Sequence, residues 1–134
     1  MCGILGGNNF NDIQEVKNGL ASIMHRGTDG NVIFHFEKSD FYMSHNRLSI
    51  QDLSESANQP LISEDEKFVL AFNGEMWKPF FRKFNNKLRK KYNFKTERSD
   101  SELLLYYLID NRDNILEAMK NLDGMFCFAF FFLF

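Results

Sequence analysis

The most apolar part of this chain is its C-terminal tract, and that tract limits what the chain can fold into. Residues Met125 to Phe134 contain no charged side chain and consist mainly of phenylalanine. The tract is shorter than the roughly 18 apolar residues that a membrane-spanning helix needs. Short, bulky and apolar, it favours a strand buried on both faces. The whole chain contains 16 phenylalanines, which makes it unusually aromatic.

Length and composition narrow the remaining possibilities. With 134 residues the chain can form one domain with its own core, and we expect that single domain to span residues 1–134. The net charge of −2 provides no basic field, so we expect neither nucleic acid nor a membrane as partner. Cys2 and Cys127 lie in no metal-binding or disulfide pattern. With no secretory signal, this indicates a reduced, cytoplasmic protein.

Residue spacing predicts alternating strands and helices. Two helix starts carry a capping box, Asp12 with Glu15 and Ser99 with Glu102. Period-two and purely apolar runs predict strands at residues 2–6, 32–36, 41–45, 67–72 and 125–134, the second and third forming a hairpin. Apolar residues at helical spacing predict helices at 12–24, 80–92, 99–108 and 113–121.

A cysteine stands directly behind the initiator methionine. Methionine aminopeptidase generally removes Met1 before a small side chain, which would leave Cys2 with a free α-amine. That amine can accept the thiol proton near neutral pH, so nucleophile and base would belong to one residue. Local sequence leaves a second interpretation open, in which Cys2 is a small buried side chain at the start of a strand.

Three polar segments lie where predicted helices or strands end. The loop from His25 to Gly30 is either a helix stop or a functional loop. Arg47 suits either a forked hydrogen bond to a carboxylate or a surface ion pair with Asp52. The Asn73-Gly74 pair predicts either a hairpin turn or a strand-to-helix turn. In the second case its amide side chain and backbone N–H could form an oxyanion hole.

Two charged features have simple structural interpretations. Asp100 falls in the first turn of a predicted helix, where the helix dipole stabilises a carboxylate. The basic residues from Arg82 to Lys91 form one helix face, for which a solvated surface is favoured over an RNA-binding site. The chain contains no glycine-rich phosphate loop, so we expect no nucleotide site.

A set of short blocks follows in a fixed order along nearly the whole chain. The blocks are Cys2-Gly3-Ile4, His25-Arg26-Gly27-Thr28-Asp29, His45-Asn46-Arg47-Leu48-Ser49-Ile50, Asp52-Leu53-Ser54, Asn58-Gln59-Pro60-Leu61, Phe72-Asn73-Gly74-Glu75, Ser99-Asp100-Ser101-Glu102 and Leu122-Asp123-Gly124-Met125-Phe126. This set resembles the class II glutamine amidotransferase domain of glutamine-hydrolysing asparagine synthetases. The blocks between residues 47 and 60 resemble that branch rather than the amidotransferases of purine or hexosamine synthesis.

The resemblance implies an N-terminal nucleophile hydrolase fold. This is an α+β, four-layer αββα sandwich with two stacked antiparallel sheets. It implies that Cys2, exposed by loss of Met1, attacks the side-chain amide of glutamine while its α-amine moves the proton. Asn73 and the Gly74 N–H are expected to hold the oxyanion. No metal is expected, and the glutaminase step needs no cofactor, since ATP and Mg²⁺ would serve the synthetase domain.

The resemblance also implies a glutamine-binding set. Arg47 is expected to bind the α-carboxylate, and Glu75 with Asp100 the α-ammonium. Leu48 and Ile50 belong to the same set of glutamine-binding residues. A loop is expected to shape the pocket near the nucleophile, with His25, Arg26 and Gly27 as its members.

The chain departs from the family pattern at several positions. Thr28 replaces the usual proline, and Trp77-Lys78 replaces the usual Tyr-Asn. One extra residue separates Thr96 from Ser99, which leaves the reach of Asp100 open. Family chains also continue with further strands and an ATP-dependent synthetase domain. We therefore expect a partial, C-terminally truncated glutaminase domain that cannot make asparagine alone.

Two functions are compatible with the sequence. The chain is either a glutaminase module that supplies ammonia to a separate synthetase subunit, or an inactive remnant that binds glutamine or a partner protein. The uncharged Phe-rich ending also predicts association between copies of the chain, because an unpaired apolar strand recruits another strand.

Overall fold

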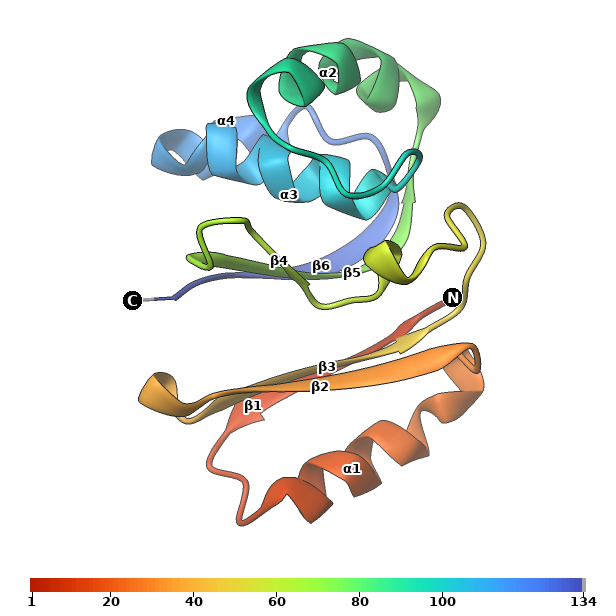
Figure 1. The fold of residues 1–134 in the computed structure, drawn as a ribbon, viewed down its shortest axis with the longest axis vertical. Helices are drawn as coiled ribbons and strands as arrows, with labels where there is room; N and C mark the ends of the chain where they lie inside the picture. Colours follow the sequence, from red (N-terminus) through yellow and green to blue (C-terminus); the bar gives the residue numbers. More distant parts are fainter. Residues whose placement is uncertain (134) are drawn as a thin grey trace.

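The chain forms four layers, with two three-stranded sheets stacked between helical layers (Figure 1). The computed structural model describes residues 1–133, apart from the side chain of Phe81. The predicted places of Phe81 on a helix face and of Phe134 in the last strand lie outside the described residues. The architecture confirms the predicted α+β sandwich of antiparallel sheets.

The first sheet contains the predicted hairpin. Strands β1 (Gly3–Asn8), β2 (Gly30–Phe36) and β3 (Phe41–Arg47) pair antiparallel in the order β1-β3-β2. The first strand does not end at the predicted Gly6, because Gly6 and Gly7 both pair with β3 and β1 extends to Asn8. Long-range pairing therefore overrides the local turn preference of glycine.

Helix α1 (Ile13–Ser22) covers the outer face of this sheet with its buried Val16 and Leu20. The predicted N-cap is confirmed, since the Asp12 side chain accepts the Glu15 N–H at 3.0 Å. The second half of the capping box differs, because the Glu15 carboxylate accepts from the Asn11 N–H at 2.8 Å. The helix also ends two residues before the predicted Met24.

The second sheet has the order β4-β5-β6, again antiparallel. Its strands are β4 (Leu61–Ile62), β5 (Phe68–Met76) and β6 (Gly124–Phe132). The prediction that the middle strand stops at Asn73 is wrong, because β5 continues to Met76 in register with β6. Gly74 permits this, with a φ of +150° and a backbone so close to β6 that a Cβ would lie 2.2 Å from the Met125 carbonyl oxygen.

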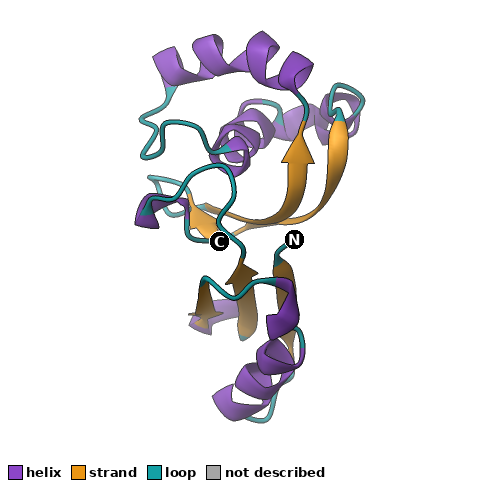
Figure 2. Cartoon of the chain, turned by 90° about the vertical axis from the view of Figure 1, so that its right-hand side faces the viewer, coloured by secondary structure: helices purple, strands orange, loops and turns teal. Residues whose placement is uncertain are grey.

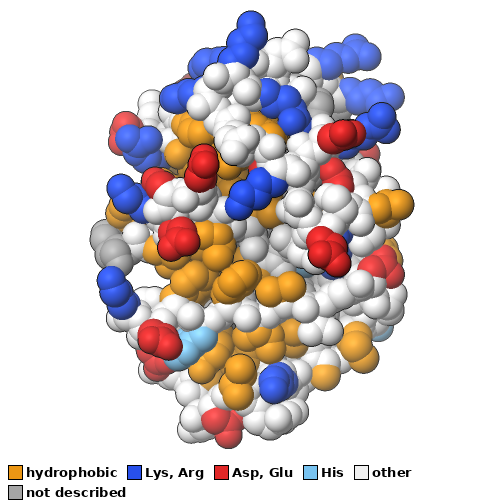
Figure 3. Space-filling model, in the orientation of Figure 1, with side chains coloured by type: hydrophobic (Ala, Val, Ile, Leu, Met, Phe, Trp, Pro, Cys, Tyr) orange, Lys and Arg blue, Asp and Glu red, His pale blue; other side chains and the backbone are white. Residues whose placement is uncertain are grey.

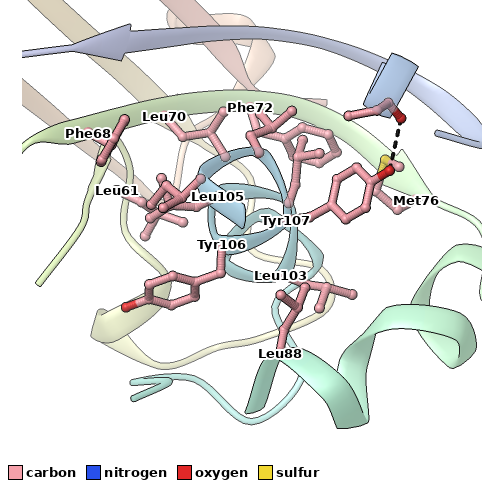
Figure 4. Close-up of a cluster of buried hydrophobic side chains, with 14 of the residues drawn as sticks. Leu61, Phe68, Leu70, Phe72, Met76, Leu88, Leu103, Leu105, Tyr106 and Tyr107 are labelled. Carbon is pink, nitrogen blue, oxygen red and sulfur yellow. Dashed lines mark hydrogen bonds between the residues drawn. The ribbon is translucent and has the colours of Figure 1, made fainter. Parts of the chain in front are cut away.

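Three helices cover the outer face of the second sheet and enclose the main core. They are α2 (Lys78–Lys91), α3 (Asp100–Asp110) and α4 (Ile115–Met119). Figure 4 shows α3 side chains packed against β5, with the Tyr107 hydroxyl donating to the Ala118 carbonyl at 3.0 Å. Short 3₁₀ segments complete the order: Met24–Arg26, Glu37–Ser39, Glu55–Ala57 and Arg112–Asn114. None of the described helices is long and apolar enough to span a membrane.

The basic side chains of α2 gather at the top of the molecule in Figure 3. Lys87 lies 3.3 Å from the Asp110 carboxylate, and Lys91 also pairs with it. The helix face predicted to be basic therefore also contacts the neighbouring α3.

Strand β6 contacts a core on each of its faces, as predicted. Phe126, Phe128 and Phe130 pack against the helix-side core. On the other face Ala129 and Phe131 join a smaller core between the two sheets. Burial of the strand is nevertheless incomplete, because β6 lies at the edge of its sheet.

Candidate functional site

A cavity of about 440 Å³ lies where the N-terminus meets the second sheet. Figure 2 shows the N-terminus at the level between the two sheets. The cavity is lined by every residue that the sequence predicted for catalysis or for glutamine binding: Cys2, Arg47, Leu48, Ile50, Asn73, Gly74, Glu75 and Asp100. Tertiary structure thus gathers residues from the segment before β1, from β3, β5 and α3, and from one loop into a single cavity.

Cys2 is half-buried, and its backbone is held on two sides. Its N–H donates to Asn73 Oδ1 at 2.8 Å, and its carbonyl accepts from Arg26 Nε at 3.0 Å. The Sγ atom accepts a weaker hydrogen bond from the Leu48 N–H at 3.4 Å. Met1 is present here and lines the same cavity, so the Cys2 nitrogen is an amide in this structure.

Asn73 has its side-chain oxygen occupied by Cys2 and its amide nitrogen available. Within the described residues no hydrogen bond engages Asn73 Nδ2. The side chain is half-buried on the wall of the cavity. The bond to Cys2 therefore orients Asn73 and leaves an N–H donor for a ligand.

The Gly74 N–H lies on the edge of β5 that faces away from β6. Alternate residues of a strand direct their N–H groups to the same side. The N–H groups of Phe72 and Met76 donate to Gln59 Oε1 at 2.6 Å and Asp100 Oδ2 at 3.0 Å, away from β6. The Gly74 N–H lies between these two and has no such partner among the described residues. The Asn73 side chain and the Gly74 backbone thus offer two neighbouring N–H donors.

Arg47 is the last residue of β3, and its guanidinium is buried against the following loop. Nη1 donates to the Ser54 carbonyl at 2.9 Å and to Asn58 Oδ1 at 2.6 Å, while Nη2 donates to the Asp52 carbonyl. The surface pair with the Asp52 carboxylate is not formed, because that carboxylate accepts from the Ser54 backbone and hydroxyl. A guanidinium has five N–H donors, and these three bonds leave two of them without a partner among the described residues. Those two donors can bind a ligand.

Asp100 lies in the first turn of α3 and is 7% exposed. Burial raises the pKa of its carboxyl, and the nearby Glu75 carboxylate raises it further, while the Met76 N–H acts in the opposite direction. Within the described residues no lysine or arginine pairs with either carboxylate. Two uncompensated carboxylates at a cavity wall favour binding of a cation such as an ammonium group.

The extra residue before α3 does not displace Asp100 from the cavity. The loop before α3 is held to this helix, because the Glu102 carboxylate accepts from the Lys95 and Thr96 N–H groups, each at 2.8 Å. The predicted N-cap of α3 is confirmed, with Ser99 Oγ accepting the Glu102 N–H at 3.3 Å.

The loop from His25 to Asp29 contacts the nucleophile segment from the other side. Its residues His25, Arg26 and Gly27 line a smaller cavity of about 250 Å³ together with Met1 and Leu48, rather than the main cavity. Arg26 reaches Cys2, and Asp29 Oδ2 accepts the Ser49 N–H at 2.7 Å. The loop therefore fixes the backbone on both sides of the Sγ atom.

Two buried residues near the site had no predicted role. The Gln59 side chain accepts a hydrogen bond from the Phe72 N–H, and the His45 ring bonds to the Phe72 carbonyl. Phe72 directly precedes Asn73. Gln59 and His45 both belong to blocks that carry the family resemblance, but nothing in their spacing indicates contact with Phe72. No group of three or more His, Cys, Asp or Glu suited to a metal ion occurs among the described residues.

A family model described as a glutamine amidotransferase domain matches residues 1–132. The chain belongs to this family. The predicted family is therefore confirmed, and the matched range contains nearly all of the amidotransferase chain.

The relatives of this amidotransferase domain include much longer proteins. It is 35% identical to a probable glutamine-hydrolysing asparagine synthetase of Dictyostelium discoideum, over 96% of this chain and 23% of the relative. Identity is also 35% to asparagine synthetase 1 of Bacillus subtilis, over 96% of this chain and 20% of the relative. A probable glutamine-hydrolysing asparagine synthetase of Schizosaccharomyces pombe is also 35% identical, over 98% of this chain and 23% of the relative. The chain thus spans about a fifth of the length of these relatives.

Proposed function

We propose that this amidotransferase domain is a glutaminase module that hydrolyses glutamine to glutamate and ammonia through Cys2. The observation that carries the proposal is the 2.8 Å bond from the Cys2 nitrogen to Asn73 Oδ1, which brings Cys2 and the Asn73 amide together. The same cavity holds Arg47 and Asp100, which match the two charges of an amino acid.

The proposed reaction begins with removal of Met1, which makes the Cys2 nitrogen an amine. The amine takes the thiol proton, and the thiolate forms a bond to the side-chain amide carbon of glutamine. Asn73 Nδ2 and the Gly74 N–H stabilise the negative oxygen. The amine then protonates the leaving nitrogen, so the C–N bond breaks and ammonia departs. Water, deprotonated by the amine, cleaves the thioester to glutamate and restores the thiol.

The substrate ends are held by groups of opposite charge. The open part of the Arg47 fork binds the α-carboxylate, while Glu75 and Asp100 bind the α-ammonium. Leu48 and Ile50 lie beside the substrate. The hydrolysis needs no cofactor, and the ammonia serves an asparagine synthetase activity located on a separate subunit, in the cytoplasm.

The proposal is tested by glutamate release from glutamine with the processed chain. Cys127 is the second cysteine of the sequence and lines the same cavity, so it provides a matched control. We expect Cys127→Ser to keep activity and Cys2→Ala to abolish it. Intact mass after a glutamine-like electrophile should show one adduct that Cys2→Ala lacks. Loss of Met1 without Cys2-dependent release would contradict the proposal and leave an inactive, glutamine-binding remnant.

A further inference from the structure

Beyond Leu70, no strand of the described residues lies beside the edge of β5 that faces away from β6, because β4 pairs there with Val69 and Leu70 alone. At Phe72 two side chains take the place of that strand. Gln59 Oε1 accepts the Phe72 N–H at 2.6 Å, and His45 Nε2 bonds to the Phe72 carbonyl at 3.1 Å. Both side chains are buried, so these bonds are shielded from water.

The His45 ring makes this single hydrogen bond. His45 is 1% exposed, and burial lowers its pKa to about 4, so the ring is neutral at physiological pH. A carbonyl can only accept, so the one ring proton lies on Nε2. Nδ1 has no hydrogen-bond partner among the described residues. An unpaired buried nitrogen costs free energy that an aliphatic side chain would avoid. What the imidazole contributes is therefore its bond to Phe72.

That bond joins the two sheets beside the cavity. His45 belongs to β3 and pairs with Ile4 of β1, two residues after Cys2. Phe72 belongs to β5 in the other sheet, and its carbonyl shares a rigid peptide plane with the nitrogen of Asn73. The nucleophile thus comes from one sheet and the oxyanion donors from the other. Their spacing depends on how firmly the sheets are joined here.

We propose that His45 is a positioning residue that locks the Phe72–Asn73 peptide to the first sheet and so sets the distance between Cys2 and its oxyanion donors. This inference rests on the glutaminase function proposed above. His45 acts through Phe72 and does not itself touch the substrate. Its loss should weaken stabilisation of the transition state more than binding of glutamine.

Two substitutions of His45 test this role in the processed chain. His45→Leu removes the donor, and His45→Gln places an N–H group near the position of Nε2. We expect His45→Leu to lower kcat on the order of 100-fold with KM changed less than about twofold. His45→Gln should recover kcat to within about fivefold of the parent chain. Met43→Leu is the matched control, since Met43 is also buried on β3, and it should leave kcat unchanged.

Hydrogen exchange supplies a readout that needs no activity. Backbone amides of residues 72–76 should exchange at least about tenfold faster in His45→Leu, and at the parent rate in His45→Gln and Met43→Leu. If exchange follows this pattern but the parent chain shows no Cys2-dependent activity, positioning of the segment stands and the glutaminase proposal falls. If the parent chain is active and His45→Leu keeps its kcat, or His45→Gln fails to recover it, the positioning role is wrong.

Discussion

The backbone nitrogen of Cys2 and the side-chain oxygen of Asn73 lie 2.8 Å apart, although 71 positions separate them in the chain. One residue precedes β1 of the first sheet, and the other lies within β5 of the second. Because this bond occupies Asn73 Oδ1, it fixes which half of the amide remains for a ligand. The remaining half is the Nδ2 donor.

Asn73 should therefore contribute through its nitrogen rather than its oxygen. Asn73→Asp keeps an acceptor for the Cys2 nitrogen but replaces the donor by a second oxygen, whereas Asn73→Ala removes both. We expect both variants to lose on the order of 100-fold or more in kcat for glutamine hydrolysis. Steady-state kinetics would contradict this role if Asn73→Asp kept more than about a tenth of the parent kcat.

Gly74 should tolerate no side chain. An alanine Cβ would lie 2.2 Å from the Met125 carbonyl oxygen at a φ of +150°. We expect Gly74→Ala to lower the free energy of unfolding by about 3 kcal/mol or more, measured by urea titration. Gly30→Ala is the control, because a Cβ there meets no atom within 4 Å. A Gly74→Ala protein as stable as Gly30→Ala would show that β5 and β6 do not approach so closely.

Asp100 should oppose stability while serving substrate binding. Its pKa is raised mainly by burial, so the folded state holds the proton more tightly than the unfolded state does. This carboxyl therefore costs stability as pH rises above its ordinary range. Asp100→Asn can still accept the Met76 N–H and should raise the unfolding temperature at pH 7, yet raise KM for glutamine about tenfold or more. If Asp100→Asn unfolded at a lower temperature than the parent chain, the predicted cost of this carboxyl to stability would be wrong.

His45 should make the protein sensitive to mild acid. Its pKa falls from 6.5 to about 4 on folding, chiefly through burial, with the nearby Arg47 charge acting in the same direction. As pH falls, His45 therefore takes up its proton at a higher pH in the unfolded chain than in the folded one. Stability is lost as pH falls from 6.5 towards 4. The full loss is about 3 kcal/mol. Urea titrations across this range should show a shallower decline for His45→Gln, and an identical decline in both proteins would exclude His45 as the cause.

The outer edge of β6, with which no other strand pairs among the described residues, should promote association. In an antiparallel pair, the backbone groups of two opposite residues point either towards each other or both away. The N–H groups of Phe72 and Met76 face away from β6, so the residues opposite this set on β6 face away from β5. They include Phe126, Phe128 and Phe130. We expect light scattering at high concentration to detect oligomers. Phe132→Lys should reduce them, although it weakens a ring contact with Phe68. Leu116→Lys, which adds the same charge on α4, should not. A monomeric parent chain would contradict the prediction.

Local sequence determined the parts of this protein whose physics is local. The N-caps at Asp12 and Ser99 bond as predicted, because a cap needs only the next three residues. The hairpin of β2 and β3 also forms where alternating residues flank a short turn. The order of short blocks indicated the family, and the family match confirms it.

Tertiary structure decided what depends on distant neighbours. Asn73-Gly74 favours a turn locally, yet pairing with Cys127 and Phe126 keeps it inside β5. Arg47 left a choice between a surface pair and a ligand, and the loop that folds over it removed the first. The contact of His45 with Phe72 joins strands of different sheets, and no local pattern encodes it. The sequence supplied the reactive groups, and the stacking of two sheets brought them to one cavity.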